Sequence, residues 1–280
     1  MTGLLTLAAT PIGNVGDATY RLVKALQSAE LIAAEDTRRL RKLLSMLEIT
    51  TEAQVVSYFD QNEVERQPWL LEQLAEGRNV LLVTDAGMPS VSDPGYRLVD
   101  AAIAQGVDVR VLPGPSAVTT AITISGLPVD RFTFEGFLPR KAGDRTRRLE
   151  ALATEPRTMV FFEAPHRTLE TLEAMQAVFG ADRRMAVCRE LTKTYEQIVR
   201  GTLADAVSWA QGDVLGEVTI VVSGLDETIA RELTPELYVA EVEARIAAGT
   251  DRKEAVGEVA KALGVPRRDV YDAVVAAKRA

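Results

Sequence analysis

Three loops rich in glycine and proline each follow a run of apolar residues, and they are the segments best suited to bind a small molecule. They span residues 10–14, 84–95 and 113–117. Glycine lets backbone amides approach a ligand closely, and proline holds a loop in one shape. Asp85 can accept hydrogen bonds from an amino group or a ribose, and Ser116 at a helix start can both cap and donate. One such loop is often only a tight turn, but three of them predict a binding site.

Several common catalytic motifs are absent from the sequence. It contains no G-x-G-x-x-G, G-x-x-x-x-G-K-[ST], G-x-S-x-G or H-E-x-x-H pattern. These absences disfavour nucleotide kinases, common nicotinamide or flavin oxidoreductases and serine hydrolases. The single cysteine, Cys188, excludes a disulfide framework, and the single histidine, His166, excludes a multi-histidine metal site. We therefore expect chemistry without a bound metal.

Charge is unevenly distributed along the chain. The net charge is −8, yet residues 38–42 hold four basic residues and no acid. Residues 138–148 hold five basic residues and one acid, and this run continues from a loop into a helix start, where cations oppose the helix dipole. Such a placement favours an anionic partner for the second run. The first run is also compatible with a solvated helix face.

Residues 1–112 alternate between apolar strands and amphipathic helices. Strands are predicted at residues 4–9, 31–34, 55–59, 80–84 and 109–112. Continuous apolar runs of this kind are typical of strands buried on both faces. The alternation predicts a mostly parallel sheet with helices on both sides. Ligands bind outside the carboxyl ends of such strands, which is where the three loops lie.

Pro113-Gly114-Pro115 marks a boundary, and the pattern changes beyond it. Strands around residues 185–190 and 196–202 follow each other directly, which predicts a hairpin and a mixed sheet. From residue 233 onward the chain is helical, and Gly264 followed by Pro266 separates two helices. We predict an α/β fold with an N-terminal lobe at 1–113, a C-terminal lobe at 114–226 and a helix-turn-helix-like tail at 227–280.

Seven blocks resemble the signature segments of the tetrapyrrole methylase superfamily, and most closely those of the bacterial 16S ribosomal RNA cytidine 2′-O-methyltransferases. In chain order they are residues 10–14, 34–38, 85–95, 113–117, 136–140, 162–167 and 189–193. The resemblance runs from about residue 4 to residue 224. A single block of this kind would be a weak signal, whereas seven in the right order are specific.

The resemblance implies two α/β lobes with S-adenosylmethionine bound in the cleft between them, commonly in a homodimer. It also implies donor contacts made largely by the backbone. Carried over by position, these involve Pro11, Asp85, Ala86, Gly87, Val91, Ser116 and Ala117 in the first lobe, and Phe162, Leu191 and Thr219 from the second half.

Methylation of a ribose hydroxyl requires alignment with the donor methyl group and removal of a weakly acidic proton. Positioning can supply about 7–11 kcal/mol, and a general base contributes about 10²–10⁴-fold. Candidate catalytic residues are Glu163, His166, Glu190 with neighbouring Lys193, and the pair Glu35-Asp36. The pair can instead cap a helix, and a lone histidine is often structural. We place Glu163 first, and the sequence leaves the alternatives open.

The resemblance implies that the RNA partner is 16S ribosomal RNA in the small ribosomal subunit. Candidate phosphate contacts are Arg38, Arg140, Lys141, Arg145 and Arg148. The helical tail can contact RNA or can serve as a packing element. By resemblance, the methylated nucleotide is a cytidine.

Three rival interpretations remain at this point. The same fold could methylate a small tetrapyrrole such as a precorrin, but a small macrocycle needs neither a basic run nor a helical tail. A non-catalytic RNA-binding factor would not need three conformationally demanding loops. An oxidoreductase would need the glycine-rich phosphate-binding motif, which this sequence lacks.

No signal peptide or membrane-length apolar stretch is seen, so we expect a soluble, cytoplasmic protein.

Overall fold

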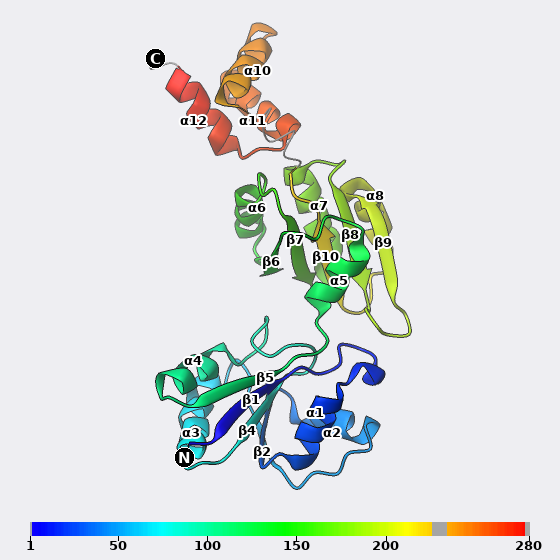
Figure 1. Ribbon diagram of the computed structural model, residues 1–280. Helices are drawn as coiled ribbons and strands as arrows, with labels where there is room; N and C mark the ends of the chain where they lie inside the picture. The colour runs from blue at the N-terminus through cyan, green and yellow to red at the C-terminus, as the bar shows by residue number, and fades with distance from the viewer. Residues whose placement is uncertain (1, 226–233, 278–280) are drawn as a thin grey trace. The chain divides into compact units, whose positions relative to one another are not determined.

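The computed structural model describes residues 2–225 and 234–277, so the predicted boundary at 226/227 lies outside the described residues. The chain divides into two compact units (Figure 1). The first comprises the chain up to Thr120 together with the short segment Leu191–Thr194. The second comprises Ala121–Glu190 and the chain from Tyr195 onward.

The first unit contains a parallel five-stranded sheet. Its strands are β1 (Leu4–Ala8), β2 (Leu31–Ala34), β3 (Gln54–Ser57), β4 (Val80–Val83) and β5 (Asp108–Leu112), in the order β3-β2-β4-β1-β5. Every pairing in this sheet is parallel. The predicted parallel sheet is thus confirmed, and all five strand carboxyl ends point the same way.

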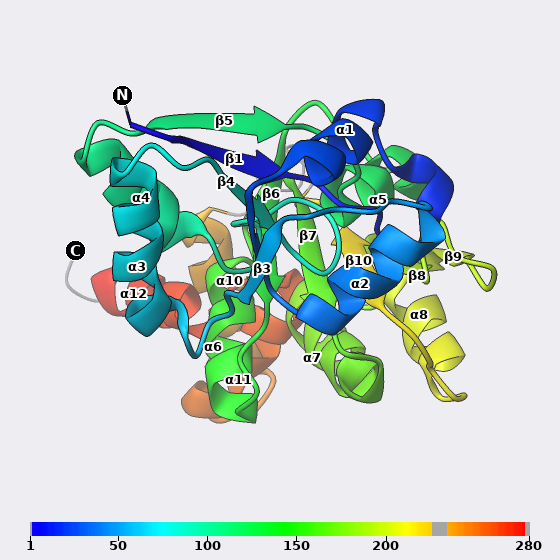
Figure 2. The same cartoon turned by 90° about the horizontal axis from the view of Figure 1, so that it is seen from below.

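Helices cover both faces of this sheet. They are α1 (Tyr20–Ser28), α2 (Thr37–Met46), α3 (Glu63–Ala75) and α4 (Tyr96–Ala104), with the short 3-10 turn η1 (Val15–Asp17) before α1. Figures 1 and 2 show α1 and α2 on one face and α3 and α4 on the other. Side chains alternate along each strand, so β1 contributes Leu5 and Leu7 to the core under α3 and α4, and Ala8 to the core under α1 and α2.

The second unit contains a mixed sheet. Its strands are β6 (Phe132–Phe137), β7 (Thr158–Glu163), β8 (Arg184–Arg189), β9 (Gln197–Thr202) and β10 (Val218–Val222), in the order β6-β7-β10-β8-β9. β6 and β7 are parallel, whereas β10 runs antiparallel to both of its neighbours. β8 and β9 pair as an antiparallel hairpin, as predicted.

One hydrophobic core lies between this sheet and three of the second unit's helices, those that begin at Ala142, Thr168 and Leu203. The helices of the second unit are α5 (Ala117–Ser125, which spans the division between the units), α6 (Ala142–Ala151), η2 (Pro165–Arg167), α7 (Thr168–Phe179) and α8 (Leu203–Ala210). Phe161, Leu172 and Ile220 are among the fully buried side chains. The predicted fold class, two α/β lobes followed by helices, is confirmed.

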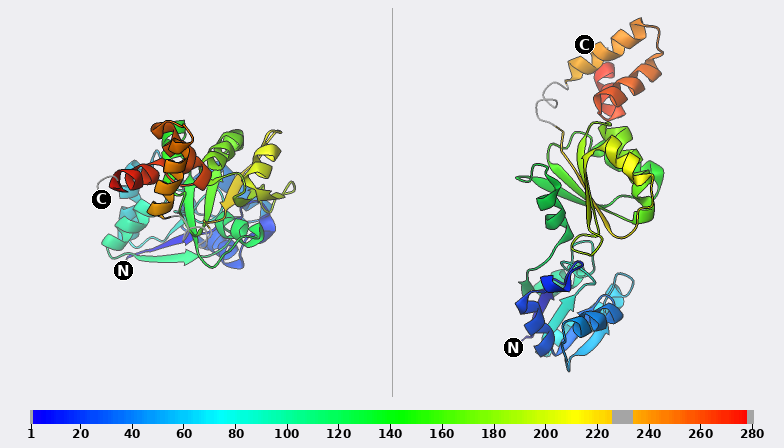
Figure 3. Two further views of the ribbon diagram at one scale, coloured as in Figure 1. Left: turned by 90° about the horizontal axis from the view of Figure 1, so that it is seen from above. Right: turned by 90° about the vertical axis from the view of Figure 1, so that its right-hand side faces the viewer.

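Within residues 234–277 the tail contains three helices, α10 (Pro235–Ala247), α11 (Arg252–Leu263) and α12 (Arg267–Ala277). They pack on one another around their own small core, with Val242, Val259 and Val270 fully buried (Figure 3). Gly264 ends α11 in the left-handed conformation, at φ 63°, as the glycine in this position predicts. Within the described ranges, no helix is both long and apolar enough to cross a bilayer.

Candidate functional site

The loops after β1, β2 and β4 meet at the carboxyl edge of the first sheet. They line a small pocket of about 50 Å³ that includes Pro11, Glu35 and Asp85. Thr10 and Gly87 exchange two backbone hydrogen bonds, with N···O distances of 2.9 and 3.1 Å, which tie the loop after β1 to the loop after β4. The edge is therefore built by loops that hold each other in place.

Two carboxylates at this edge brace the backbone reciprocally. Glu35 Oε2 accepts from the Asp85 amide at 3.0 Å, and Asp85 Oδ1 accepts from the Asp36 amide at 3.1 Å. Arg39 Nε lies 3.3 Å from Asp85 Oδ2. Burial raises the pKa of Glu35 and of Asp85, because desolvation disfavours the charged form. Carboxylates that line a pocket and have raised pKa values are more common at functional sites than elsewhere in proteins.

The loop from Asp85 to Gly95 is held in a strained conformation. Ser90 and Ser92 have φ values of 69° and 63°, which side chains disfavour, and Gly95 has a φ of 137°. A Cβ on Gly95 would stand 2.7 Å from Ser90 Oγ, so only glycine fits there. Strain of this kind persists only where surrounding contacts impose it, and it clusters at ligand-binding sites.

A buried tyrosine–glutamate pair holds the end of that loop in place. Glu63 Oε1 accepts from the Gly95 amide at 3.2 Å and from the Tyr58 hydroxyl at 2.8 Å. Both side chains are buried, and burial together with the hydrogen bond to Glu63 raises the pKa of the Tyr58 hydroxyl. Sequence reasoning missed this pair, since neither residue stands in a glycine or proline loop.

The loop after β5 approaches β1 closely. A Cβ on Gly114 would lie 2.9 Å from Ala9 Cβ, so glycine permits this approach. The carbonyl of Ser116 accepts from the Thr120 amide at 3.0 Å, which places Ser116 at the N-terminus of α5. Ser116 and Ala117 therefore lie where the sequence predicted them, at a helix start after a strand end.

The segment Leu191–Thr194 comes from the second half of the chain but packs with the first unit. The Asn14 amide donates to Thr192 Oγ1 at 3.0 Å, and a Cβ on Gly13 would lie 2.8 Å from the Leu191 carbonyl oxygen. Two predicted residues, Leu191 and Lys193, are thereby brought to the loop that contains Pro11. Thr192 has a φ of 64°, a further strained position.

Glu163, our first candidate for the base, is buried at the end of β7. Its Oε2 accepts from Thr171 Oγ1 at 2.6 Å, and its Oε1 accepts from the Ala164 amide at 2.8 Å. Arg167 Nε lies 3.4 Å from the same Oε1. With both oxygens engaged and 3% of the residue exposed, this carboxylate ties β7 to α7.

The other predicted catalytic side chains lie in different surroundings. Glu190 Oε1 accepts from the Glu217 amide at 2.9 Å, and Glu190 has a φ of 52°. His166 is exposed in η2, directly after β7.

Two residues of the second unit were predicted to contact the methyl donor. Thr219 is the register partner of Phe162 on neighbouring strands, so these two residues are adjacent.

The predicted RNA-binding residues divide by exposure. Arg140 and Lys141 are exposed at the start of α6, and Arg148 is exposed with an ion pair to Glu135. Arg38 is exposed and forms a two-armed pair with Asp36, which lowers the pKa of that carboxyl. Arg145 is only 3% exposed.

Arg145 therefore does not belong to a surface strip, which corrects the prediction for this residue. Its guanidinium bonds to Glu170 and to the carbonyl of Arg140. The cause is helical periodicity, because Arg145 and Leu149 lie on the face of α6 that is buried.

No group of three or more histidine, cysteine or acidic side chains that could hold a metal occurs within residues 2–225 and 234–277. Cys188 is buried, and burial raises the pKa of its thiol to about 12, so it is not a reactive thiolate.

The chain is similar to known proteins over its whole length. The family model described as tetrapyrrole (corrin/porphyrin) methylases matches residues 4–207. A ribosomal RNA small subunit methyltransferase I from Mycobacterium tuberculosis is 50% identical over 279 residues, covering 99% of this chain and 96% of that protein. The protein of the same name from Bacillus subtilis is 43% identical and covers 97% of this chain and 94% of its own length.

Solved structures share the fold at low sequence identity. The uroporphyrin-III C-methyltransferase of Thermus thermophilus aligns with a TM-score of 0.57 and 20% identity, covering 79% of this chain and 94% of that one. A cobalt precorrin-4 methyltransferase aligns with a TM-score of 0.59 and 20% identity, with the same coverage. The chain therefore belongs to the tetrapyrrole methylase family and, within it, to the family of the ribosomal RNA small subunit methyltransferase I proteins.

Proposed function

We propose that this protein transfers a methyl group from S-adenosylmethionine to the 2′-hydroxyl of a cytidine ribose in 16S ribosomal RNA. The observation that carries the proposal is the 50% identity, over 99% of the chain, to a ribosomal RNA small subunit methyltransferase I. The tetrapyrrole methyltransferase structures cover only 79% of the chain. About a fifth of this protein therefore has no counterpart in those enzymes, as expected if it serves a larger substrate.

The donor residues in this proposal are those at the carboxyl edge of the first sheet. They are Pro11, Asp85, Ala86, Gly87, Val91, Ser116, Ala117 and Leu191, with Phe162 and Thr219 from the second unit. Asp85 and Glu35 suit a ligand that carries an ammonium and a sulfonium charge, because half-buried carboxylates gain from a nearby cation. The bound donor supplies an electrophilic methyl group. The protein aligns that group with the ribose oxygen and accepts the proton.

His166 is the group that accepts the hydroxyl proton in this proposal. An imidazole nitrogen can accept a proton, and an exposed loop position lets it reach a substrate. Glu163 is less suited, since Thr171 and Ala164 already occupy its two oxygens. Glu190 and Lys193 act in positioning, since Glu190 Oε1 accepts from Glu217 and Lys193 lies in the segment packed at Gly13.

Exposed cations on α6 and α2 bind the RNA backbone in this proposal. Arg140 and Lys141 directly precede α6, Arg148 lies in its last turn, and Arg38 lies at the start of α2. Phosphate contacts of this kind position the substrate without reading its sequence. A substrate in the ribosome places the enzyme in the bacterial cytoplasm.

We also propose a homodimer. On the first unit, α4 and β5 leave three apolar side chains, Tyr96, Ile103 and Val111, exposed together near a shallow pocket. Exposed apolar patches of this kind mark interfaces in soluble proteins. Replacing Val111 by Glu should shift the sedimentation coefficient from dimer to monomer, and a monomeric unaltered protein would rule the dimer out.

The decisive experiment offers three acceptors side by side with donor labelled in its methyl group. The acceptors are assembled small ribosomal subunits, naked 16S ribosomal RNA and a precorrin. Label should enter RNA only, should survive as a 2′-O-methylated cytidine after digestion, and should be highest with assembled subunits. Label on a base would overturn the 2′-O assignment, and label in the precorrin alone would establish a tetrapyrrole methyltransferase.

A further inference from the structure

A second concave site lies in the second unit, at the edge of its sheet opposite to Phe162 and Thr219. Its walls come from the segments that precede β6, β7 and β8, the segment that follows β10 and the C-terminal end of α11. It has a volume of about 670 Å³. β7 separates Thr158 at this pocket from Phe162 by four residues, or about 13 Å at the rise of a strand. None of the residues predicted to contact the donor lines it.

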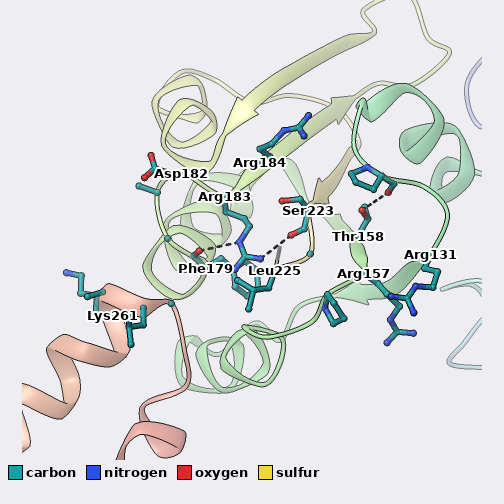
Figure 4. A pocket seen from close by; sticks show the side chains of 18 of the residues that line it. Arg131, Arg157, Thr158, Phe179, Asp182, Arg183, Arg184, Ser223, Leu225 and Lys261 are labelled. Atoms are coloured by element: carbon teal, nitrogen blue, oxygen red, sulfur yellow. Dashed lines mark hydrogen bonds between the residues drawn. The ribbon is translucent and has the colours of Figure 1, made fainter. Parts of the chain in front are cut away.

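The lining of this pocket is strongly basic. Five cations line it, and only two acids do, Asp130 and Asp182. The cations are Arg131, Arg157, Arg183, Arg184 and Lys261. Figure 4 shows Arg183 at the centre, with Arg131 and Arg157 together on the other side of Ser223 and Leu225, and with Asp182 directed away from Arg183. Four arginines around one hollow favour an anionic ligand, because the guanidinium fork matches phosphate geometry.

Arg183 at the centre of the pocket is held without a carboxylate. Its three nitrogens donate to the carbonyl oxygens of Phe179, Ser223 and Ala153 at 3.4, 3.5 and 3.5 Å. Its guanidinium also lies over the Phe179 ring, 5.7 Å from the centroid. No ion pair joins Arg183 to an acid within the described part of the chain, and burial lowers the pKa of its guanidinium.

The rim arginines differ in how far they are neutralised. Arg157 is paired through two nitrogens with Glu155, at 2.6 and 2.9 Å. Arg184 is exposed and donates to the carbonyl of Gly126 at 3.2 Å, which orients it, and no ion pair joins Arg184 to an acid among the residues that the structure describes. Arg183 is the partly buried one among these, and a partly buried cation without a counter-ion is unfavourable unless an anion joins it. The pocket is thus arranged to receive negative charge.

We propose that this pocket, centred on Arg183, binds phosphate groups of the RNA substrate's backbone at nucleotides away from the one that is methylated. The inference rests on the proposed function, which supplies a polyanion as substrate. The pocket is a wide, open hollow, which suits a polymer chain better than one enclosed ion. It gives the second unit a phosphate contact that is separate from the cations of α6.

Steady-state methyl transfer to small ribosomal subunits, measured over a range of salt concentrations, tests the proposal. In the double variant Arg131→Gln/Arg183→Gln we expect the KM for subunits to rise about tenfold. The slope of log affinity against log salt should become less steep by about 1.5, since each lost phosphate contact removes about 0.7–0.9. The KM for S-adenosylmethionine should not change.

Matched variants separate charge, geometry and folding. Arg183→Lys keeps the charge and should keep most of the salt slope, whereas Arg21→Gln removes an exposed cation of α1 and should change neither quantity. Arg131→Gln alone, which leaves the centre of the pocket intact, should lower the slope by about 0.8. This single variant keeps the test available if loss of Arg183 prevents folding.

Three outcomes distinguish a failure of this inference from a failure of the proposed function. If the unaltered enzyme transfers no methyl group to RNA, the proposed function fails. If it does transfer the group, and the double variant keeps the full salt slope, only the inference fails. If inorganic phosphate competes with subunits equally well in the double variant and the unaltered enzyme, the pocket is not the phosphate site.

Discussion

The two sheets of this protein end in chemically different edges. The carboxyl edge of the parallel sheet carries the braced carboxylates Glu35 and Asp85, whereas the mixed sheet of the second unit has a hollow lined by arginines at one edge. Carboxylates suit a donor that bears positive charge, and arginines suit a polyanion. If the proposed function holds, we therefore expect donor binding mainly at the first sheet and RNA binding mainly in the second unit.

The largest effect should come from replacing the proposed base. His166→Ala should lower kcat by about 10²–10⁴-fold, because a general base contributes that much to proton removal. The KM for S-adenosylmethionine should stay the same, since His166 is not among the residues proposed to contact the donor. Single-turnover methyl transfer to small subunits measures this. A kcat within threefold of normal would remove His166 from the mechanism.

The next largest effect should come from the acidic edge. Asp85→Asn should weaken donor binding by about 10–100-fold, because a hydrogen bond to a charged group contributes about 1.5–3 kcal/mol. Isothermal titration with S-adenosylmethionine measures it, and RNA affinity in the absence of donor serves as the control. Equal losses of donor and RNA affinity would contradict the division of roles between the two sheets.

Glu163→Gln should reduce stability more than catalysis. The buried carboxylate binds Thr171, Ala164 and Arg167, so its neutralisation should lower the free energy of unfolding by about 1–3 kcal/mol. Denaturant unfolding measures the change, and kcat at a temperature where the variant is folded should fall less than threefold. A loss of kcat as large as that of His166→Ala would restore Glu163 as the base.

Removing two exposed cations of α6 should have a moderate effect on RNA alone. Arg140→Ala/Lys141→Ala should make the slope of log RNA affinity against log salt less steep by about 1.4–1.8. Donor affinity should not change.

Arg145→Ala should instead lower the melting temperature, because this side chain is buried against Glu170. Filter binding and thermal unfolding distinguish the two variants.

The smallest effect concerns stability against pH. Burial raises the folded-state pKa of Glu35 above its ordinary value of 4.5, so the folded protein holds this proton more tightly than the unfolded chain. The stabilisation of the folded state by this proton is fully present below pH 4.5, the ordinary pKa of a glutamate. It is lost as the pH rises through the pKa that Glu35 has in the folded protein. Glu35→Gln should therefore melt slightly higher than the unaltered protein at pH 7.5, and the advantage should vanish near pH 4. An equal difference at both pH values would contradict this origin.

Much of the fold was predictable because its signals are local. The continuous apolar runs at β1 and β4 and the direct succession of β8 and β9 predicted a parallel sheet and a hairpin, and both are confirmed. The glycine and proline loops were placed correctly at strand ends. Short-range patterns suffice there, since strand burial and turn geometry depend on a few adjacent residues.

The surroundings of individual polar side chains were not predictable in the same way. Tyr58 and Glu63 secure the loop end at Gly95 without any loop signature of their own. Arg145 looks like its basic neighbours in the sequence but faces inward. Glu163 likewise stands in a block typical of the family, yet its oxygens are already bonded.

By itself, the sequence determined the order of strands and helices, the loops at the carboxyl ends of the first sheet and membership of a methylase family. The tertiary structure decided which polar groups are available for chemistry. It buried Glu163 and Arg145, paired Glu35 with Asp85, and joined Leu191–Thr194 to the loop at Gly13. The physical reason is that burial and long-range hydrogen bonds depend on how distant segments pack, which no local spacing of residues records.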